Sequence, residues 1–516
     1  MNESPASSFS LSRYLSPRKL AFITGTLLLT STGIICRILG FFYRIFMSRT
    51  IGAEGLGLYN MVHPVFSICF AVCAGSVQTA LSQYVAANQE KGKTVFRTGL
   101  TIAMSMSLLL AWLISSHADF LARQLLLEPR CAPYLPVIAV SVPFAALHAC
   151  INGYYYGMQK ARVPAFSQVA EQVIRMSAVF LIAHIWLESG RPITVSLAVY
   201  GHLIGEMASA GYTLLALGTF PPGKSAGPQV SAPFGQTASA LMSLALPLMG
   251  NRLVLNLLGS AEAVWIPNKL MAFGLSNSEA LSVYGVFTSM ALPFILFPSA
   301  ITNSIAVLLL PSAAEAHAAG NRERLSSMIS MSLRYSCYMG IFCIGIFTLF
   351  GEQLGTSVFH DKSAGSFISI LCWLCPFMYL ATTMGSILNG MGKTSSTFLQ
   401  NICAMMIRLL FVLFAIPRFG ILGYLCGMLV SELTLALMSF LSVRKLVPFR
   451  WDSVNMLLKP FLLLLVSIGI DLAFSSLVPL PQNIPGFLDA SLHIGVIGCC
   501  YLGLLLVLHR PEKDRN

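Results

Sequence analysis

The stretch that decides the fold is TSTGIICRILGFFYRIFMSR, residues 30–49, in which Arg37 and Arg44 interrupt an apolar run and Arg49 follows it. The run extends from about residue 21 to about residue 46, and roughly 20 apolar residues are enough to cross a bilayer. Arg37 lies far from both ends of this run, where a charge costs about 2.5 to 3.5 kcal/mol on insertion scales. We therefore expect a transmembrane helix whose charged side chain faces a cavity or a partner rather than lipid.

The composition of the whole chain also indicates a membrane protein. Of its 516 residues, 56% are hydrophobic and 10% charged, whereas a soluble domain carries about 25% charged residues. This excludes a water-soluble fold and predicts an all-α polytopic membrane protein with about fourteen transmembrane helices. The predicted spans are 21–46, 59–85, 97–115, 134–156, 164–187, 194–217, 238–258, 280–310, 331–350, 366–389, 396–416, 420–442, 457–478 and 489–508.

The net charge of +12 reflects membrane topology rather than nucleic-acid binding, because the basic residues are scattered through short loops. With the N-terminus in the cytoplasm, roughly twenty basic residues lie inside and seven outside. The outside set is Arg49, Arg123, Arg130, Arg191, Lys269, Lys362 and Arg418. We expect a multi-pass protein of the bacterial cytoplasmic membrane with both termini cytoplasmic, and a first helix that is retained because no cleavage site follows it.

Internal repeats predict a duplicated six-helix unit. YYGMQK ending at Lys160 is similar to LNGMGK ending at Lys393, and GHLIGE ending at Glu206 is similar to GMLVSE ending at Glu432. EGLGLY, ending at Tyr59, likewise parallels EALSVY. Six is an even number, so the two copies insert in the same orientation, with the expected site between them near mid-bilayer. The predicted organisation is a tail at 1–20, an N-lobe at 21–218, a linker at 219–237, a C-lobe at 238–443 and a two-helix extension with a tail at 444–516.

Charged residues inside the predicted spans are the candidate site. The substrate-binding candidates are Arg37, Arg44, Arg175, Arg252, Arg408 and Asn256, and the candidate coupling or cavity acids are Glu171, Glu206 and Glu432. If Glu171 neutralises Arg175 and Glu432 neutralises Arg408, an excess of positive charge remains. That balance suits a diphosphate, which arginine binds through paired hydrogen bonds, and it does not suit an organic cation.

A purely structural role stays open for several of these residues. Arg44 can extend to the interface along its own aliphatic chain, and the Glu171–Arg175 pair can be purely structural. Cys372 and Cys375 form a C-x-x-C pair without a second pair, which favours packing over a metal site. We expect no catalytic residue, metal or cofactor, while a coupling ion, Na⁺ or H⁺, stays open.

Three segments resemble the multidrug/oligosaccharidyl-lipid/polysaccharide (MOP) flippase superfamily, closest to its stage V sporulation protein B and polysaccharide biosynthesis branch. They are TSTGIICRILGFFYRIFMSRTIGAEGLGLYNMVHPVF at 30–66, EQVIR ending at Arg175, and ALPFILFPSAITNSIAVLLLPSAAEA at 291–316. The resemblance implies two rocking lobes, first-helix arginines at Arg37 and Arg44 that line the cavity, and last helices that help to form a groove for a lipid tail. The family's further arginine in the second helix is absent here, which leaves the identity of the headgroup open.

The resemblance implies an alternating-access flippase for an undecaprenyl-diphosphate-linked saccharide, a peptidoglycan or polysaccharide precursor for the cell wall or the spore cortex. The expected partners are that lipid-linked substrate and the membrane, with no nucleic acid, and we expect a monomer. A place within a cell-wall synthesis complex stays open. A multidrug or organic-ion antiporter of the same fold is the alternative, and it would need a cavity of acids and aromatic residues. A membrane glycosyltransferase is the rival from another class, but no loop here is long enough to carry catalytic carboxylates.

Overall fold

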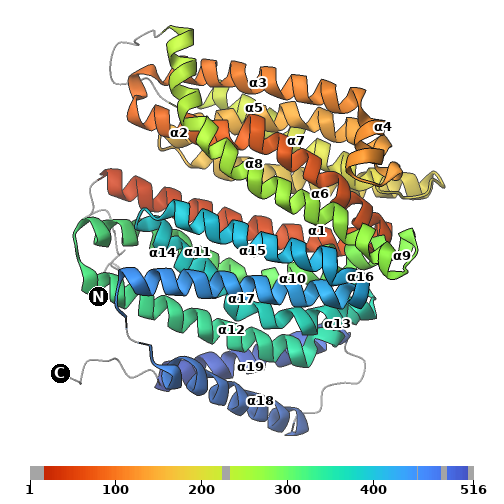
Figure 1. The fold of residues 1–516 in the computed structure, drawn as a ribbon, viewed down its shortest axis with the longest axis vertical. Helices are drawn as coiled ribbons and strands as arrows, with labels where there is room; N and C mark the ends of the chain where they lie inside the picture. Colours follow the sequence, from red (N-terminus) through yellow and green to blue (C-terminus); the bar gives the residue numbers. More distant parts are fainter. Residues whose placement is uncertain (1–16, 223–232, 450, 478–484, 509–516) are drawn as a thin grey trace, which may run out of the picture. The chain divides into compact units, whose positions relative to one another are not determined.

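The computed structural model describes residues 17–222, 233–449, 451–477 and 485–508. Every regular element in these ranges is helical (Figure 1), as the sequence predicts. The predicted tail at 1–20 lies largely outside the described residues, as do both termini and most of the predicted linker with Lys224. The expectation that both termini are cytoplasmic therefore stays a prediction.

Thirteen described helical segments are long and apolar enough to cross a membrane, close to the fourteen predicted. The first two predicted spans form one continuous segment, residues 28–87, and the predicted span 280–310 is divided into residues 277–296 and 299–318. One predicted span, at 194–217, is a helix but is not among the thirteen. Its polar residues, His202 and Glu206 among them, lower its mean hydropathy, and both are buried.

The helices cluster into two compact units. Unit 1 contains the residues up to Gly40 and Val62–Asn256, and unit 2 contains Phe41–Met61 and everything from Leu257 onward. The chain passes between the units within two long helices, α1 (Pro17–Phe70) and α8 (Phe234–Phe273). This division differs from the predicted lobes, which placed 41–61 in the first half and all of 238–258 in the second.

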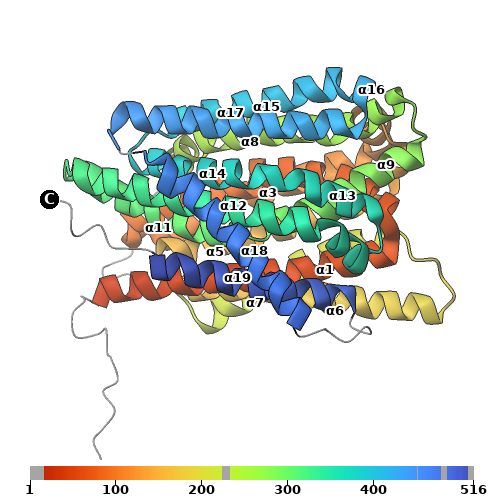
Figure 2. The same cartoon turned by 90° about the horizontal axis from the view of Figure 1, so that it is seen from below.

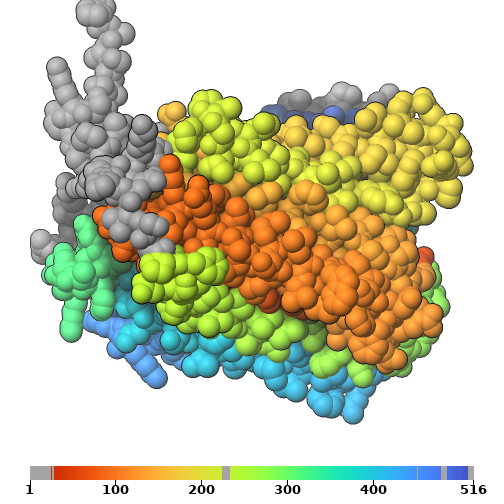
Figure 3. Space-filling model, turned by 90° about the horizontal axis from the view of Figure 1, so that it is seen from above, coloured from red at the N-terminus to blue at the C-terminus, as the bar shows by residue number. Residues whose placement is uncertain are grey.

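In unit 1, the central helix α5 packs against α2, α3 and α7, and α6 packs against α7. These helices are α2 (Ser76–Ala87), α3 (Gly92–Ser116), the short α4 (Ala118–Phe120), α5 (Leu135–Gly157), α6 (Arg162–Glu188) and α7 (Ser196–Thr219). Figure 3 looks onto α3, whose orange residues form much of that face. Leu108, Leu109 and Trp112 are exposed on this helix, as a surface that meets lipid requires.

Unit 2 repeats this packing around α14, which contacts α11, α12 and α17, while α15 packs against α17. Its helices are α9 (Asn277–Gly285), α10 (Leu292–Leu296), α11 (Ser299–Ala318), α12 (Arg322–Phe359), α13 (Lys362–Leu371), α14 (Cys375–Gly390), α15 (Thr394–Phe414), α16 (Ile416–Phe419), α17 (Ile421–Leu446), α18 (Lys459–Leu477) and α19 (Gly486–Leu508). The extension helices α18 and α19 pack against each other and against α12 (Figure 2). The duplication predicted from the repeats is therefore present in the helix packing.

The two central helices also end in the same turn. Gln159 after α5 and Gly392 after α14 both have positive φ, 58° and 77°. In each turn the following lysine, Lys160 or Lys393, donates its N–H to the carbonyl five residues back at 2.9 Å. This left-handed residue and its backward hydrogen bond terminate a helix by satisfying its last carbonyls. The repeated sequences YYGMQK and LNGMGK thus encode a repeated helix end.

A kink in α1 replaces the loop predicted between the first two spans. Gly52 has φ 71° and ψ 179°, a conformation that other residues rarely adopt, whereas the chain on both sides is helical. Arg49, predicted in an outside loop, lies within α1 and donates from Nε to the carbonyl of Val358 at 2.9 Å. Because Val358 lies in the last turn of α12, the guanidinium neutralises the negative end of that helix.

Candidate functional site

Unit 1 buries a cluster of charged side chains around Arg175 of α6. Arg175 forms the predicted ion pair with Glu171, one turn earlier, and its Nη2 lies 3.9 Å from Oε1 of Glu206 on α7. On the other side of Glu206, Nε2 of His148 on α5 lies 2.7 Å from Oε2. Glu206 is only 6% exposed. Gly205 leaves room for this arrangement, since a Cβ there would lie 2.6 Å from Nε of Arg175.

A second histidine extends the cluster toward α1. His202 lies one turn before Glu206 on α7 and is buried, with its ring edge-to-face on Phe66 at 4.4 Å between centroids. Within the described residues, Nε2 of His202 and Nδ1 of His148 are buried without a hydrogen-bond partner. The sequence analysis did not include His148, although a lone histidine inside the predicted span 134–156 was a usable signal.

The geometry of this cluster can be tested against a metal ion. Ligand atoms of His148, Glu171 and Glu206 all lie within 4.8 Å of one another, which is close enough for one cation. Arg175, however, already pairs with Glu171 and approaches Glu206, so a cation would have to displace the guanidinium. With neutral histidines, two carboxylates and one guanidinium leave a single excess negative charge. Because the guanidinium already occupies the space between the carboxylates, the arrangement fits a hydrogen-bonded ionic network better than a dedicated metal site.

Unit 2 builds a related cluster around Arg408 of α15, the repeat counterpart of Arg175. Nε of Arg408 lies 3.4 Å from Oε1 of Glu262 on α8. The hydroxyl of Tyr424 on α17 donates to the same oxygen at 2.7 Å. Tyr424 is 3% exposed and packs edge-to-face against Phe287 at 5.1 Å. Each unit therefore holds the repeated arginine against a buried carboxylate.

The partner of Arg408 differs from the sequence-based expectation. Glu432 was expected to neutralise it, but Glu432 forms no ion pair within the described residues, and Glu262 takes that place. The physical reason is the length of α8, which continues to Phe273, whereas the predicted span ends at 258. Glu262 lies in the part of α8 that follows the predicted apolar span. The sequence offered no clear signal for this residue.

The remaining three arginines have no carboxylate partner among the described residues. Arg37 is exposed on α1 and forms no hydrogen bond or ion pair with any described residue. Arg44 is also exposed, and its one hydrogen bond among the described residues is long, 3.5 Å from Nη1 to the carbonyl of Thr288. Arg252 on α8 is half-buried and donates to the hydroxyl of Thr79 at 3.0 Å. These are the uncompensated positive charges that the sequence predicted.

Asn256 follows Arg252 by four residues on α8, so the two share a helix face, and Asn256 is partly buried. Thr79 on α2, which the sequence analysis did not select, completes this polar group. Gly75, the residue before α2, leaves space for the side chain of Arg252. A Cβ at Gly75 would collide with the guanidinium of Arg252.

Two family models match the chain. The model described as polysaccharide biosynthesis protein matches residues 22–311, more than half of the chain, and the MatE model matches residues 269–414. Among curated proteins, stage V sporulation protein B of Bacillus subtilis (strain 168) is 26% identical over 520 residues, covering 96% of this chain and 97% of the relative. Lipid II flippase MurJ of the same strain is 22% identical over 422 residues, covering 75% and 76%.

Solved structures share the fold. Lipid II flippase MurJ in an inward closed conformation superposes with a TM-score of 0.70 at 13% identity, covering 94% of this chain and 100% of that one. An inward-facing multidrug resistance MATE family transporter of the MOP superfamily gives a TM-score of 0.63 at 14% identity, covering 81% and 97%. At these identities the likeness describes the fold alone.

Proposed function

Because the chain belongs to the polysaccharide biosynthesis protein family of the MOP superfamily, we propose that it is an alternating-access flippase for an undecaprenyl-diphosphate-linked saccharide. Two relatives support this substrate class, one named as a lipid II flippase and one as a stage V sporulation protein. The proposed cargo is a peptidoglycan or polysaccharide precursor, used in the spore cortex. The proposal takes the protein as a monomer of the bacterial cytoplasmic membrane, with both termini in the cytoplasm.

The observation that carries the proposal is the charge state of the membrane-spanning arginines. Arg175 and Arg408 are compensated by carboxylates, whereas Arg37, Arg44 and Arg252 have no acidic partner among the described residues. Holding an unpaired guanidinium within a membrane segment is expensive unless it serves a ligand. Arginine binds phosphate through paired, charge-assisted hydrogen bonds, so a diphosphate is the ligand class that fits.

An apolar groove in unit 2 supports a lipid-linked cargo. A pocket of about 420 Å³ lies among α11, α12 and α19, and aliphatic and aromatic side chains form most of its lining. Ile305, Phe342 and Leu505 come one from each helix. We propose that this groove holds part of the isoprenoid tail, in agreement with the role that the family resemblance gives to the last helices.

A multidrug antiporter of the same fold is the second candidate, favoured by the MatE match and by the MATE-like structures. Such a transporter needs acids that are available to a cationic drug. Here Glu171, Glu206 and Glu262 each lie against an arginine or a histidine, which leaves Glu432 as the one candidate acid without an ion pair among the described residues. The relatives are flippases and transporters rather than enzymes, which leaves the glycosyltransferase without support.

The test is complementation of a flippase-deficient strain, with the inner- and outer-leaflet pools of lipid-linked precursor measured. We expect Arg252→Ala and Arg37→Ala each to lower transport at least about tenfold, because one lost charge-assisted hydrogen bond costs about 1.5 to 3 kcal/mol. Arg191→Ala is the matched control, since Arg191 is exposed between α6 and α7 and outside the spans. Normal abundance with lost transport supports the proposal. Full transport by both variants, or transport lost only together with abundance, refutes it.

A further inference from the structure

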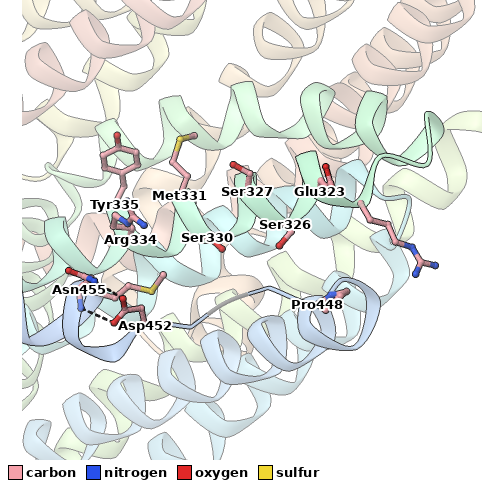
Figure 4. A pocket seen from close by; sticks show the side chains of 12 residues that line it. Glu323, Ser326, Ser327, Ser330, Met331, Arg334, Tyr335, Pro448, Asp452 and Asn455 are labelled. Carbon is pink, nitrogen blue, oxygen red and sulfur yellow. Dashed lines mark hydrogen bonds between the residues drawn. The ribbon is translucent and has the colours of Figure 1, made fainter. Parts of the chain in front are cut away.

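A polar pocket of about 650 Å³ lies in unit 2 at the N-terminal end of α12, and none of the charged residues of the clusters described above lines it. Figure 4 shows its two walls. One wall is a face of α12 carrying Ser326, Ser327 and Ser330, and the other is the segment after α17 that carries Asp452 and Asn455. None of the motifs identified in the sequence predicted this pocket.

The α12 wall is a continuous stripe of polar side chains. Glu323, Ser327, Ser330 and Arg334 are spaced by 4, 3 and 4 residues, which places them on one helix face. The hydroxyls of Ser326, Ser327 and Ser330 have no hydrogen-bond partner among the described residues. Serines elsewhere on this helix do bond locally, as Ser332 does to the carbonyl of Met328 at 2.8 Å. The stripe therefore offers several unused donors and acceptors to one ligand.

Arg334 stands where the polar pocket meets the apolar groove. Arg334 and the adjacent Tyr335 line both the polar pocket and the apolar groove among α11, α12 and α19. Within the described residues, Nε of Arg334 is buried without a hydrogen-bond partner, and its guanidinium forms no ion pair. A cation with an unused donor, set between an apolar groove and a hydroxyl-rich pocket, is suited to the phosphate of an amphipathic molecule.

The opposite wall supplies acceptors. Asp452 accepts from the backbone N–H groups of Val454 and Asn455, at 3.1 Å each, and from the Asn455 side-chain amide at 2.5 Å. These hydrogen bonds, the Asn455 amide foremost, hold the pKa of the Asp452 carboxyl below its usual range. The exposed carboxylate therefore stays ionised, and its remaining acceptor sites suit the hydroxyls of a sugar.

Both walls are fixed to the scaffold. The hydroxyl of Tyr338 on α12 donates to the carbonyl of Asn455 at 3.1 Å, and the hydroxyl of Tyr501 on α19 donates to the carbonyl of Tyr338 at 3.1 Å. Trp451 packs edge-to-face on Phe440 of α17 at 5.6 Å. A binding site held this way loses little entropy when a ligand is bound.

We infer that this pocket is a docking site for the saccharide head of a lipid-linked saccharide, with a phosphate at Arg334 and the isoprenoid tail in the adjoining groove. The inference rests on the proposed function and adds a second substrate site, separate from Arg37 and Arg252. Along α12 the apolar groove comes first, then Arg334, then the stripe of serine hydroxyls. A lipid-linked saccharide has its parts in the same order: an apolar tail, a phosphate and a sugar. From Arg334 to Arg322 the helix rises about 18 Å. A saccharide can occupy that length, whereas a glycerophospholipid headgroup would fill only its first part.

The test measures binding of an undecaprenyl-diphosphate-linked saccharide to the purified full-length protein in nanodiscs, by native mass spectrometry or radioligand saturation. We expect Arg334→Gln to weaken binding about tenfold. Ser330→Leu, which fills the pocket with a good helix former, should weaken binding of this probe but not of undecaprenyl diphosphate alone. Arg324→Gln is the matched control, because Arg324 lies on the same helix turn as the pocket but pairs with Glu315 at 3.2 Å and does not line it.

The outcomes separate this inference from the proposed function. Wild-type-like binding by both Arg334→Gln and Ser330→Leu overturns the docking site even if transport is present. Equal competition by phosphatidylglycerol, with no discrimination of the saccharide, also overturns it, because the occupant would then be a membrane phospholipid. Saccharide-dependent binding lost in Arg334→Gln but kept in Arg252→Ala supports it. Absence of all transport by the wild-type protein would refute the proposed function while these binding results still decide the pocket.

Discussion

Removing the charge of Glu262 is the sharpest test of the buried cluster in unit 2. Glu262→Gln keeps an oxygen that can accept from Tyr424 but leaves Arg408 without an ion-pair partner among the described residues. At the observed 3.4 Å and an effective dielectric constant of about 20, the lost attraction is about 5 kcal/mol. Breaking a buried pair by removing one partner costs about 3 to 5 kcal/mol in measured cases, so we expect a loss of unfolding free energy in that range.

A double-mutant cycle isolates the pair from other effects of each substitution. Arg408→Met removes the cation and fills similar space with an apolar chain, so the double variant contains neither charge. We expect the double variant to be more stable than the sum of the two single losses implies, by about 2 kcal/mol or more. Replacing both members of a buried ion pair with uncharged groups often changes the free energy of unfolding very little. The second substitution should therefore restore most of the stability that the first one removes.

The measurement is the free energy of unfolding in mixed micelles, or in bicelles by steric trapping, for the wild type and the three variants. Arg418→Met is a control for the loss of one arginine, because Arg418 lies on the short α16 and outside the spanning segments. A coupling energy near zero would show that water screens Arg408 and Glu262 from each other. The reading of Arg408 as a compensated, structural arginine would then be refuted.

Two further substitutions probe close contacts. Gly205→Ala places a Cβ 2.6 Å from Nε of Arg175, so the guanidinium must move away from Glu206 and transport should fall, whereas Gly211→Ala on the same helix meets nothing within 4 Å and should transport normally. Equal transport by both variants would show that this cluster need not be intact. Arg49→Ala removes hydrogen bonds to the last carbonyls of α12 and should lower stability by about 1.5 to 3 kcal/mol, measured as the thermal midpoint in detergent, with Arg49→Lys recovering part of the loss.

The membrane fold and the duplication were predictable because both depend on local patterns. Apolar length decides that a helix spans, and the paired motifs ending at Lys160 and Lys393 each carry the residue that terminates the central helix. Interactions between neighbouring turns were also accessible, since Glu171 and Arg175 lie four residues apart and form the expected ion pair.

Interactions between distant helices were not predictable from the same patterns. His148 meets Glu206 across 58 residues of chain and Glu262 meets Arg408 across 146, and no spacing rule links them. Hydropathy also could not distinguish a loop from a kink between residues 46 and 59, where the backbone of α1 leaves the helical conformation at Gly52. The polar pocket of unit 2 was also not predictable. Its serines form no recognisable motif in the sequence, and only the fold brings them together with Asp452 and Arg334.

The two repeats keep an arginine at one position but surround it differently, and this asymmetry bears on mechanism. Arg175 faces two carboxylates, one of which also contacts a histidine, whereas Arg408 faces one carboxylate that accepts a hydrogen bond from a tyrosine. A duplicated unit begins with identical partners, so the conserved role must lie in the arginine itself and the divergent role in its neighbours. Under the proposed function, compensation inside each unit leaves Arg37, Arg44 and Arg252, together with Arg334 of the proposed docking site, to contact an anionic cargo. An arginine held in a membrane segment without a carboxylate partner carries a free-energy cost, which binding of an anionic cargo would offset.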